Sequence, residues 1–511
     1  MAWTPARTIA ECDRLLTAPN SFAEMHQRVI DGRVLRVYTH LWPSFRAFWL
    51  ECAQRHAQHE YLVFKGERWT YEGAHREVLK IAGLLGQVYG VKKGDSWVGS
   101  RCARMRAYIP SPIDIYLACP LKLRSLSWLP VDVVKHCLCN TDCKVILLDD
   151  ERAQSLEPLV DQIKKDAGCV ELLVFRGGDR QPKGMKRLVD ALTAYGEDGS
   201  SVLRSDPGIL PEDNATVMFT SGTGVLSTQR AGLSNIINVL AGSVKDALRN
   251  GLIDAVPRNI DPPEPRGVSL VGIPFFHLVV TCLGGKLVLM KKWNPEEGAR
   301  LILQEKVTSV GGVPSLVSDI VTLAENGGPL AGYPLLGTSV GGAASPRALI
   351  ERARRSFGQV SIGSGYGMTE TNSVAVGVVG QEYLTRPSAC GLASPINDLL
   401  IVDADSMKVC KPGQLGEVWI RGVNVMRGYW KDEAATAKAI TKDGYMRTGD
   451  LGVMDSEGFL YIRDRLKDII IRGGENIDSS TVENALHADE GVLEAAAVAV
   501  PDERLGELPA A

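Results

Sequence analysis

Apolar runs rich in β-branched residues alternate with helix-like segments along most of this 511-residue chain, and this alternation limits the fold more than any other feature. It predicts an α/β protein of layered helices and sheets, with buried and largely parallel strands. The expected strands are residues 145–148, 172–175, 268–273, 287–290 and 307–313. The expected helices are residues 71–89, 236–250, 295–304 and 345–357. Residues 415–421 and 458–462 are typical of shorter strands and predict a small β unit.

Charge and hydropathy exclude several classes of protein. The chain is long enough for two or more domains, and its net charge is −3. It has no basic excess or polybasic run that would indicate nucleic acid or anionic lipid as a partner. The longest apolar run, residues 271–290, is broken by Pro274, His277 and Lys286, so we expect no transmembrane segment. The first residues lack the layout of a signal peptide, and we expect a soluble, cytoplasmic protein.

The chain has eleven cysteines, and without a secretory signal reduced thiols are the default. Cys137, Cys139 and Cys143 lie close together, with His136 adjacent, which raises the alternative of a metal site. No fourth ligand follows at a standard zinc spacing. We therefore expect buried thiols at the end of a helix, just before the strand at residues 144–148.

Five short motifs follow one another toward the C-terminal end. They are residues 219–227, 341–346, 365–370, 444–450 and 463–477. The first is rich in Ser, Thr and Gly, and small residues of this kind let backbone N–H groups approach a phosphate. Each motif alone has a plainer interpretation as a Gly-rich turn, a strand-to-helix turn or a charged turn before a strand. Their order in one chain is what indicates a function.

Three of these blocks, Gly365–Glu370, Tyr445–Asp450 and Tyr461–Asp468, resemble in this order the adenylate-forming superfamily of AMP-dependent synthetases and ligases. The resemblance implies a large N-terminal domain over residues 1–463, built of layered α/β subdomains with a small β unit. It further implies a small α+β C-terminal domain, which is incomplete here and covers residues 464–511. ATP-driven activation of a carboxylate is the chemistry that this resemblance implies.

The resemblance also implies roles for single residues on the phosphate and adenine side. The loop residues Thr220, Ser221, Gly222 and Thr223 would hold the β- and γ-phosphates. Gly342 would line the adenine and acyl pockets. Tyr366, with Gly367 beside it, would stack on adenine, because a ring offers a flat apolar face. Thr369 would contact the α-phosphate, and Glu370 would hold Mg²⁺, which prefers hard oxygen ligands.

Five further residues take roles from the same resemblance. Asp450 would accept hydrogen bonds from both ribose hydroxyls, as a carboxylate can, and Arg465 would also reach the ribose. Gly473 and Gly474 would lie in the loop that approaches the pantetheine thiol. His277 would close the acyl channel, although a histidine beside an apolar run is as often structural.

The leading segment favours one branch of the superfamily. Residues 9–13, 29–33 and 69–71 look like the start of medium- and long-chain acyl-CoA ligases. This favours CoA as thiol acceptor and a fatty acid as the small carboxylic acid. The implied reaction uses ATP and Mg²⁺ to form an acyl-adenylate and pyrophosphate. Attack by the CoA thiol on this mixed anhydride then gives acyl-CoA and AMP.

The chain departs from the family at places where the chemistry happens. Between Thr223 and Gly224 about five residues are missing from the phosphate loop, including its lysine. The small domain ends before the late lysine of the family pattern. The alternative is therefore a non-catalytic nucleotide- or acyl-binding relative, or an incomplete gene product.

One segment does not follow the family pattern. Residues 95–127 should hold a strand, a helix and a strand, yet they contain three prolines and little periodicity. This suggests a misread gene segment, and a divergent surface loop is the alternative.

Overall fold

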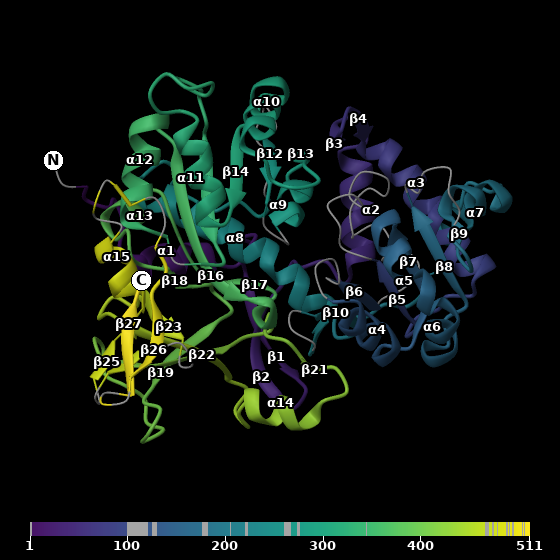
Figure 1. The fold of residues 1–511 in the computed structure, drawn as a ribbon. Coiled ribbons are helices and arrows are strands. Elements are labelled where there is room, and N and C mark those ends of the chain that lie inside the picture. The colour runs from purple at the N-terminus through teal and green to yellow at the C-terminus, as the bar shows by residue number, and fades with distance from the viewer. Residues whose placement is uncertain are drawn as a thin grey trace.

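The computed structural model of the 511-residue protein describes most of the chain. The described residues are 3–99, 121–124, 130–175, 182–204, 206–219, 223–259, 267–272, 276–343, 345–465, 470–472, 475–477, 479–486, 489, 491–492, 495–502, 504 and 506–511. Two large sheets lie side by side, each covered by helices, and smaller sheets lie below them (Figure 1). This arrangement confirms the α/β fold predicted from the sequence.

The first large sheet has eight strands in the order β21-β11-β10-β6-β5-β7-β8-β9. Its strands are β5 Ser96–Gly99, β6 Leu121–Arg124, β7 Cys143–Asp149, β8 Glu171–Phe175, β9 Lys186–Arg187, β10 Asn214–Phe219, β11 Gly224–Thr228 and β21 Gly428–Tyr429. Pairing is parallel from β10 to β9 and antiparallel from β10 through β11 to β21. The strands expected at residues 145–148 and 172–175 are confirmed.

The second large sheet has nine strands in the order β18-β17-β16-β15-β14-β12-β13-β3-β4. Its strands are β3 Glu60–Phe64, β4 Glu67–Thr70, β12 Val268–Val271, β13 Lys286–Leu289, β14 Ser309–Gly312, β15 Gly337–Gly341, β16 Ser361–Met368, β17 Ser373–Val379 and β18 Leu392–Ala393. Every pairing from β16 to β3 is parallel. The carboxyl ends of these strands therefore share one edge, where open α/β sheets bind ligands.

Three smaller sheets are present in the described part of the chain. The small β unit predicted from the sequence is a four-stranded antiparallel sheet of β19 Asp398–Val402, β20 Leu415–Arg421, β22 Met446–Met454 and β23 Leu460–Arg465. The N-terminal hairpin consists of β1 Met25–Ile30 and β2 Arg33–Tyr38. The C-terminal sheet comprises β24 Ile470–Arg472, β25 Glu475–Ile477, β26 Val498–Asp502 and β27 Gly506–Ala510. Helix α15 Ser479–Leu486 packs against β23, and the Ser479 amide donates to Asp464 Oδ2 (2.7 Å).

The remaining α-helices are α1 Ile9–Leu16, α2 Phe45–Arg55, α3 Tyr71–Gly83, α4 Val131–Asn140, α5 Asp150–Leu156, α6 Val160–Ala167, α7 Leu188–Tyr195, α8 Gln229–Arg249, α9 Phe276–Cys282, α10 Pro295–Glu305, α11 Pro314–Thr322, α12 Arg347–Phe357, α13 Gln381–Thr385 and α14 Glu433–Ala439. Helix α8 begins at Gln229, not at residue 236 as predicted. Thr228 caps it by accepting a hydrogen bond from the Ala231 amide (3.1 Å). The sequence analysis missed this start because the first turns of the helix contain polar residues. Two of them, Ser234 and Asn235, are buried by tertiary contacts.

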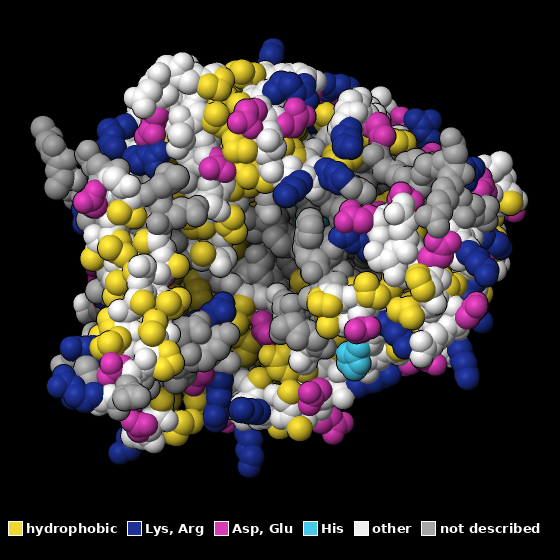
Figure 2. Space-filling model, viewed as in Figure 1, with side chains coloured by type: hydrophobic (Ala, Val, Ile, Leu, Met, Phe, Trp, Pro, Cys, Tyr) yellow, Lys and Arg dark blue, Asp and Glu magenta, His cyan; other side chains and the backbone are white. Residues whose placement is uncertain are grey.

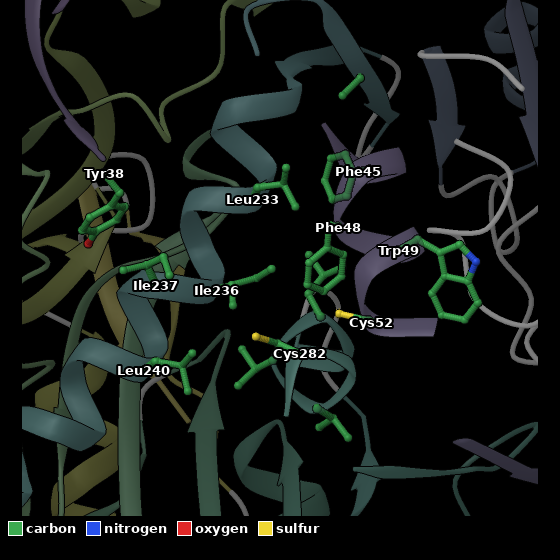
Figure 3. Close-up of a cluster of buried hydrophobic side chains, with 14 of the residues drawn as sticks. Tyr38, Phe45, Phe48, Trp49, Cys52, Leu233, Ile236, Ile237, Leu240 and Cys282 are labelled. Atoms are coloured by element: carbon green, nitrogen blue, oxygen red, sulfur yellow. The ribbon is translucent and has the colours of Figure 1, made fainter. Parts of the chain in front are cut away.

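Helix α8 runs through the centre of the largest hydrophobic core. In Figure 3, Leu233 and Ile236 point toward Phe45 and Phe48 of α2. The N-terminal hairpin lies on the other side of α8, where Tyr38 Oη donates to Asn238 Oδ1 (2.8 Å). Burial of each such apolar side chain contributes about 1.5–3 kcal/mol. The helix is thus held from two sides and supports both large sheets.

Residues 95–127 are partly described. Strands β5 and β6 lie at the two ends of this segment and provide both strands that the family pattern expects there. Residues 100–120 and 125–127 lie outside the described residues, so the hypothesis of a misread gene segment stays a hypothesis. No helix in the described part of the chain is long and apolar enough to cross a membrane.

Candidate nucleotide site

Residues of several sequence motifs lie where the two large sheets and the small β unit come together. A short helix, η6 Thr369–Thr371, follows β16 directly and packs against β11 of the other large sheet. The face drawn in Figure 2 is hollowed near its centre, between the halves that carry the two large sheets. The site is therefore assembled from several segments that are far apart in the sequence.

Tyr366, Asp450 and Arg465 form one connected group. Tyr366 Oη donates to Asp450 Oδ2 (2.6 Å), and Arg465 Nε lies 3.4 Å from Asp450 Oδ1. Asp450 and Arg465 are direct cross-strand partners in β22 and β23, which brings their side chains to the same place. Burial, then the charge of Asp450, raise the pKa of Tyr366 well above its ordinary value, so the phenol keeps its proton and remains a donor.

The turn before Asp450 explains how this carboxylate is aimed. Gly449 has φ +73°, a left-handed conformation that glycine adopts without strain, and its amide donates to Glu417 Oε1 (3.0 Å). The Asp450 amide donates to Thr448 Oγ1 (3.1 Å). The Asp450 side chain is only 10% exposed, whereas that of Arg465 is 59% exposed. A buried carboxylate with lone pairs beyond those used by Tyr366 can accept hydrogen bonds from a bound hydroxyl pair.

Glu370 is held by a tyrosine that the sequence analysis missed. Tyr429 Oη donates to Glu370 Oε1 (3.1 Å), and the Met426 amide donates to the Glu370 carbonyl (2.6 Å). Burial, followed by the nearby charge of Glu370, raises the pKa of Tyr429 to about 12. A glycine-aromatic-aromatic run at residues 428–430 was the available signal, but it indicates no function by itself.

A buried amide network fixes the backbone on which Thr369 and Glu370 sit. Asn372 has φ +54° and donates from Nδ2 to the Asn424 carbonyl (2.9 Å). Asn424 Nδ2 in turn donates to the Thr371 carbonyl (3.1 Å), and both asparagines are fully buried. The carbonyl of Thr371, the last residue of η6, is thereby satisfied, and the segment around residue 424 is tied to the chain that leaves η6. Neither asparagine belonged to a recognised motif.

The predicted phosphate loop lies between two strands that are paired up to its ends. Phe219 pairs with Gly224 across the β10–β11 hairpin, which leaves only residues 220–223 for the connection. Thr223 is exposed, and Thr220, Ser221 and Gly222 lie outside the described residues. A Cβ on Gly224 would lie 2.6 Å from the Val217 side chain, so the strand after the loop requires glycine.

No lysine lies between Lys186 and Lys245, so the loop has no lysine of its own. The nearby Arg230 does not replace it. Its guanidinium pairs with Glu212 (2.7 Å), and its side chain is 8% exposed. A buried guanidinium that is already paired with a carboxylate is not available to balance the charge of a bound phosphate.

The other predicted site residues are placed differently. Gly342, with φ +83°, directly follows β15, whose last residue Gly341 pairs with Gly365 of β16 at the carboxyl edge of the sheet. His277 is buried in the first turn of α9, which follows β12. Strand β12 lies three strand spacings, about 14 Å, along the sheet from β16. The predicted thiol-loop residues Gly473 and Gly474 lie outside the described residues, and all these roles stay predictions.

Gly367 is expected to tolerate no side chain. A Cβ there would lie 1.6 Å from the Ser373 carbonyl oxygen, which is backbone, whereas a Cβ on Gly365 would meet the Val374 side chain at 3.3 Å. Gly367→Ala should therefore displace β17 and lower the thermal midpoint by several degrees or more. Gly365→Ala, two residues earlier, is the matched comparison and should cost clearly less. Thermal unfolding followed by circular dichroism measures both, and equal midpoints would contradict the expected clash.

The cysteine cluster lies at the end of a helix and the start of the next strand, as expected from the sequence. Cys137 is near the end of α4 and Cys143 starts β7, both fully buried. Thr141 Oγ1 lies 2.9 Å from Cys143 Sγ, and burial raises the pKa of the Cys137 thiol to about 11. Within the described ranges, no group of three or more His, Cys, Asp or Glu side chains could hold a metal ion.

Comparison with known proteins places this geometry in a family. The sequence profile of the AMP-binding enzyme family matches residues 49–430. The chain is 32% identical over 473 residues to a long-chain-fatty-acid–CoA ligase of Thermus thermophilus, a match that covers 87% of this chain and 80% of the relative. It is 33% identical over 326 residues to 4-coumarate–CoA ligase-like 9 of Arabidopsis thaliana, where the match covers 61% of this chain and 55% of the relative.

The fold is also shared with a solved enzyme. The o-succinylbenzoate coenzyme A synthetase of Bacillus subtilis, solved in complex with ATP and a magnesium ion, superposes with a TM-score of 0.67. The alignment covers 92% of this chain and 88% of that enzyme at 20% identity, which shows the shared fold. Since the family profile spans most of the residues and the Thermus relative matches along nearly the whole chain, this protein belongs to the AMP-binding enzyme family.

Proposed function

We propose that the protein activates a carboxylic acid with ATP and transfers the acyl group to the thiol of CoA. The observation that carries this proposal is the Tyr366–Asp450–Arg465 group beside the Glu370–Tyr429 pair. It offers an aromatic ring, a buried carboxylate, a cation and a second carboxylate around one region. Membership of the AMP-binding enzyme family and the named activities of both relatives support the same conclusion.

The donor set fits a magnesium nucleotide. Glu370 is a partly buried carboxylate oriented by Tyr429, and Mg²⁺ in proteins is usually bound by one or two carboxylates together with substrate phosphates. When bound, Mg²⁺ would neutralise charge that develops on the phosphates. Asp450 and Arg465 would hold the ribose, Tyr366 would contact the adenine, and Thr369 at the start of η6 would donate to the α-phosphate.

The substrate class and the reaction sequence are part of the proposal. The acid carboxylate would attack the α-phosphate of ATP to give an acyl-adenylate and pyrophosphate. The CoA thiol would then displace AMP. We infer a fatty acid as substrate from the leading segment and from the named activity of the Thermus relative. His277, in the first turn of α9, would close the acyl channel.

The experiment that tests this function is acid-dependent exchange of labelled pyrophosphate into ATP. A panel of fatty acids of increasing chain length and of aromatic acids would be offered to the purified protein, with the reaction without acid as background. The proposal requires exchange above background with at least one acid and formation of its CoA thioester. Binding of AMP without any acid-dependent exchange would instead support the alternative, a non-catalytic nucleotide binder.

Removal of the Asp450 carboxylate should weaken AMP binding by about 1–3 kcal/mol, the cost of leaving buried donors unpaired. Asp450→Ala deprives the Tyr366 hydroxyl of its acceptor and Arg465 of its counter-charge. Tyr366→Phe keeps the ring and the carboxylate, so it should weaken binding less. Calorimetric titration with AMP measures all three proteins, and equal affinity for wild type and Asp450→Ala would refute the ribose role.

A further inference from the structure

One short segment joins the metal-ligand candidate to the phosphate loop. The amide of Met426 donates to the Glu370 carbonyl (2.6 Å), on the side of the nine-stranded sheet. Within the next four residues, the amides of Arg427 and Trp430 donate to the carbonyls of Leu226 (2.8 Å) and Gly224 (2.7 Å) in β11. Residues 426–430 therefore connect η6 to the strand that leaves the phosphate loop, through three backbone hydrogen bonds.

Tyr429 lies in the middle of this segment and is fixed at both ends. Its backbone pairs with Val225 in β11, and its amide donates to Thr436 Oγ1 of α14 (2.8 Å). Its side chain reaches across to the other sheet, where Oη donates to Glu370 Oε1 (3.1 Å).

A hydrogen bond to one oxygen of a carboxylate restricts the orientation of the other. Glu370 has a long flexible side chain, and an unrestrained glutamate samples many rotamers. With Oε1 bonded to Tyr429, Oε2 is held in one direction and keeps its lone pairs for a cation. Residues that hydrogen-bond to a metal ligand commonly change the affinity of the site for its metal ion, although they do not bind the metal themselves.

We propose that Tyr429 is a positioning residue: it holds the Glu370 carboxylate ready for the magnesium–nucleotide complex and couples that carboxylate to the strand after the phosphate loop. This inference rests on the proposed function, since it assumes a magnesium nucleotide near Glu370. The inference goes beyond the proposed function by assigning a role to a residue outside the five sequence motifs. Tyr429 acts only through Glu370 and touches neither acid nor CoA in this account.

The test compares Tyr429→Phe with a matched control. Tyr461→Phe removes another tyrosine hydroxyl that donates to a carboxylate at the same distance, Asp455 Oδ2 at 3.1 Å, away from Glu370. Calorimetry would measure ATP affinity over a series of Mg²⁺ concentrations, and AMP affinity without metal. In Tyr429→Phe, the Mg²⁺ concentration needed for half-maximal ATP binding should rise about 10- to 100-fold while AMP affinity is unchanged. Tyr461→Phe should match wild type in both.

A second comparison separates positioning from simple packing. In a Glu370→Gln background, Tyr429→Phe should add little further change, because both substitutions act on the same interaction. An unchanged Mg²⁺ midpoint in Tyr429→Phe, or a parallel loss of AMP affinity, would overturn the positioning role. These binding measurements need no turnover. A wild-type protein without acid-dependent exchange would overturn the proposed function, while the Mg²⁺ midpoints would still decide the role of Tyr429.

Discussion

Insertion of a segment of about five residues ending in Pro-Lys between Thr223 and Gly224 should raise acid-dependent ATP–pyrophosphate exchange by about 10²–10³-fold. Adenylation brings a carboxylate up to an anionic phosphate, and repulsion in a low-dielectric cleft is costly. The present loop spans only residues 220–223 and has no lysine. Arg230 is committed to Glu212, so it leaves this charge unbalanced.

The insertion should be tolerated by the fold. It extends a hairpin connection without touching the Phe219–Gly224 pair, and roughly doubling a loop costs about 0.6 kcal/mol. The matched control carries the same segment with Gln in place of Lys. Equal exchange by the two insertion variants would show that loop length, and not the charge, limits the reaction. Strong exchange by the unmodified chain would show that the lysine is dispensable here.

Glu370→Gln should reduce acid-dependent exchange by about 10²–10³-fold, since it replaces the charged metal ligand by a neutral amide of the same shape. Gln can still accept the hydrogen bond from Tyr429, so the local packing should persist. AMP binding should be retained, because the Tyr366–Asp450–Arg465 group does not involve Glu370. Initial rates at saturating Mg²⁺, with AMP calorimetry beside them, measure both effects.

Glu433→Gln is the control for loss of a carboxylate as such. Glu433 is exposed at the start of α14, in the same part of the molecule, and has no predicted role. It should leave exchange unchanged. If Glu370→Gln and Glu433→Gln had the same activity, Glu370 would not be the magnesium ligand.

Much of the fold could be predicted because many of its helices and strands show a clear local pattern of apolar and polar residues. Strands β7 and β8 and helices α10 and α12 lie close to the residues expected from periodicity. Helix α8 was placed too late, because its first turns are polar and are buried only by contacts with other elements. Local composition reports the average environment of a residue type, and tertiary packing overrides it at such positions.

For the candidate site, the sequence indicated Tyr366, Glu370 and Asp450 by short motifs but was silent about Tyr429 and about Asn372 and Asn424. The motifs consist of neighbouring residues, so they can be recognised in the sequence without a structure. Tyr429 and the two asparagines act through groups in other segments. A hydrogen bond between distant segments leaves no periodic signal in either of them.

By itself, the sequence determined the α/β layering, the small β unit, the short phosphate loop and the motifs that make this chain resemble adenylate-forming enzymes. Only the tertiary structure decided which of those residues meet. Tyr366 and Asp450 are 84 residues apart, and Glu370 and Tyr429 are 59 residues apart. These pairs form because strands of three different sheets converge at one place, and that convergence depends on the packing of the whole chain and not on any local pattern.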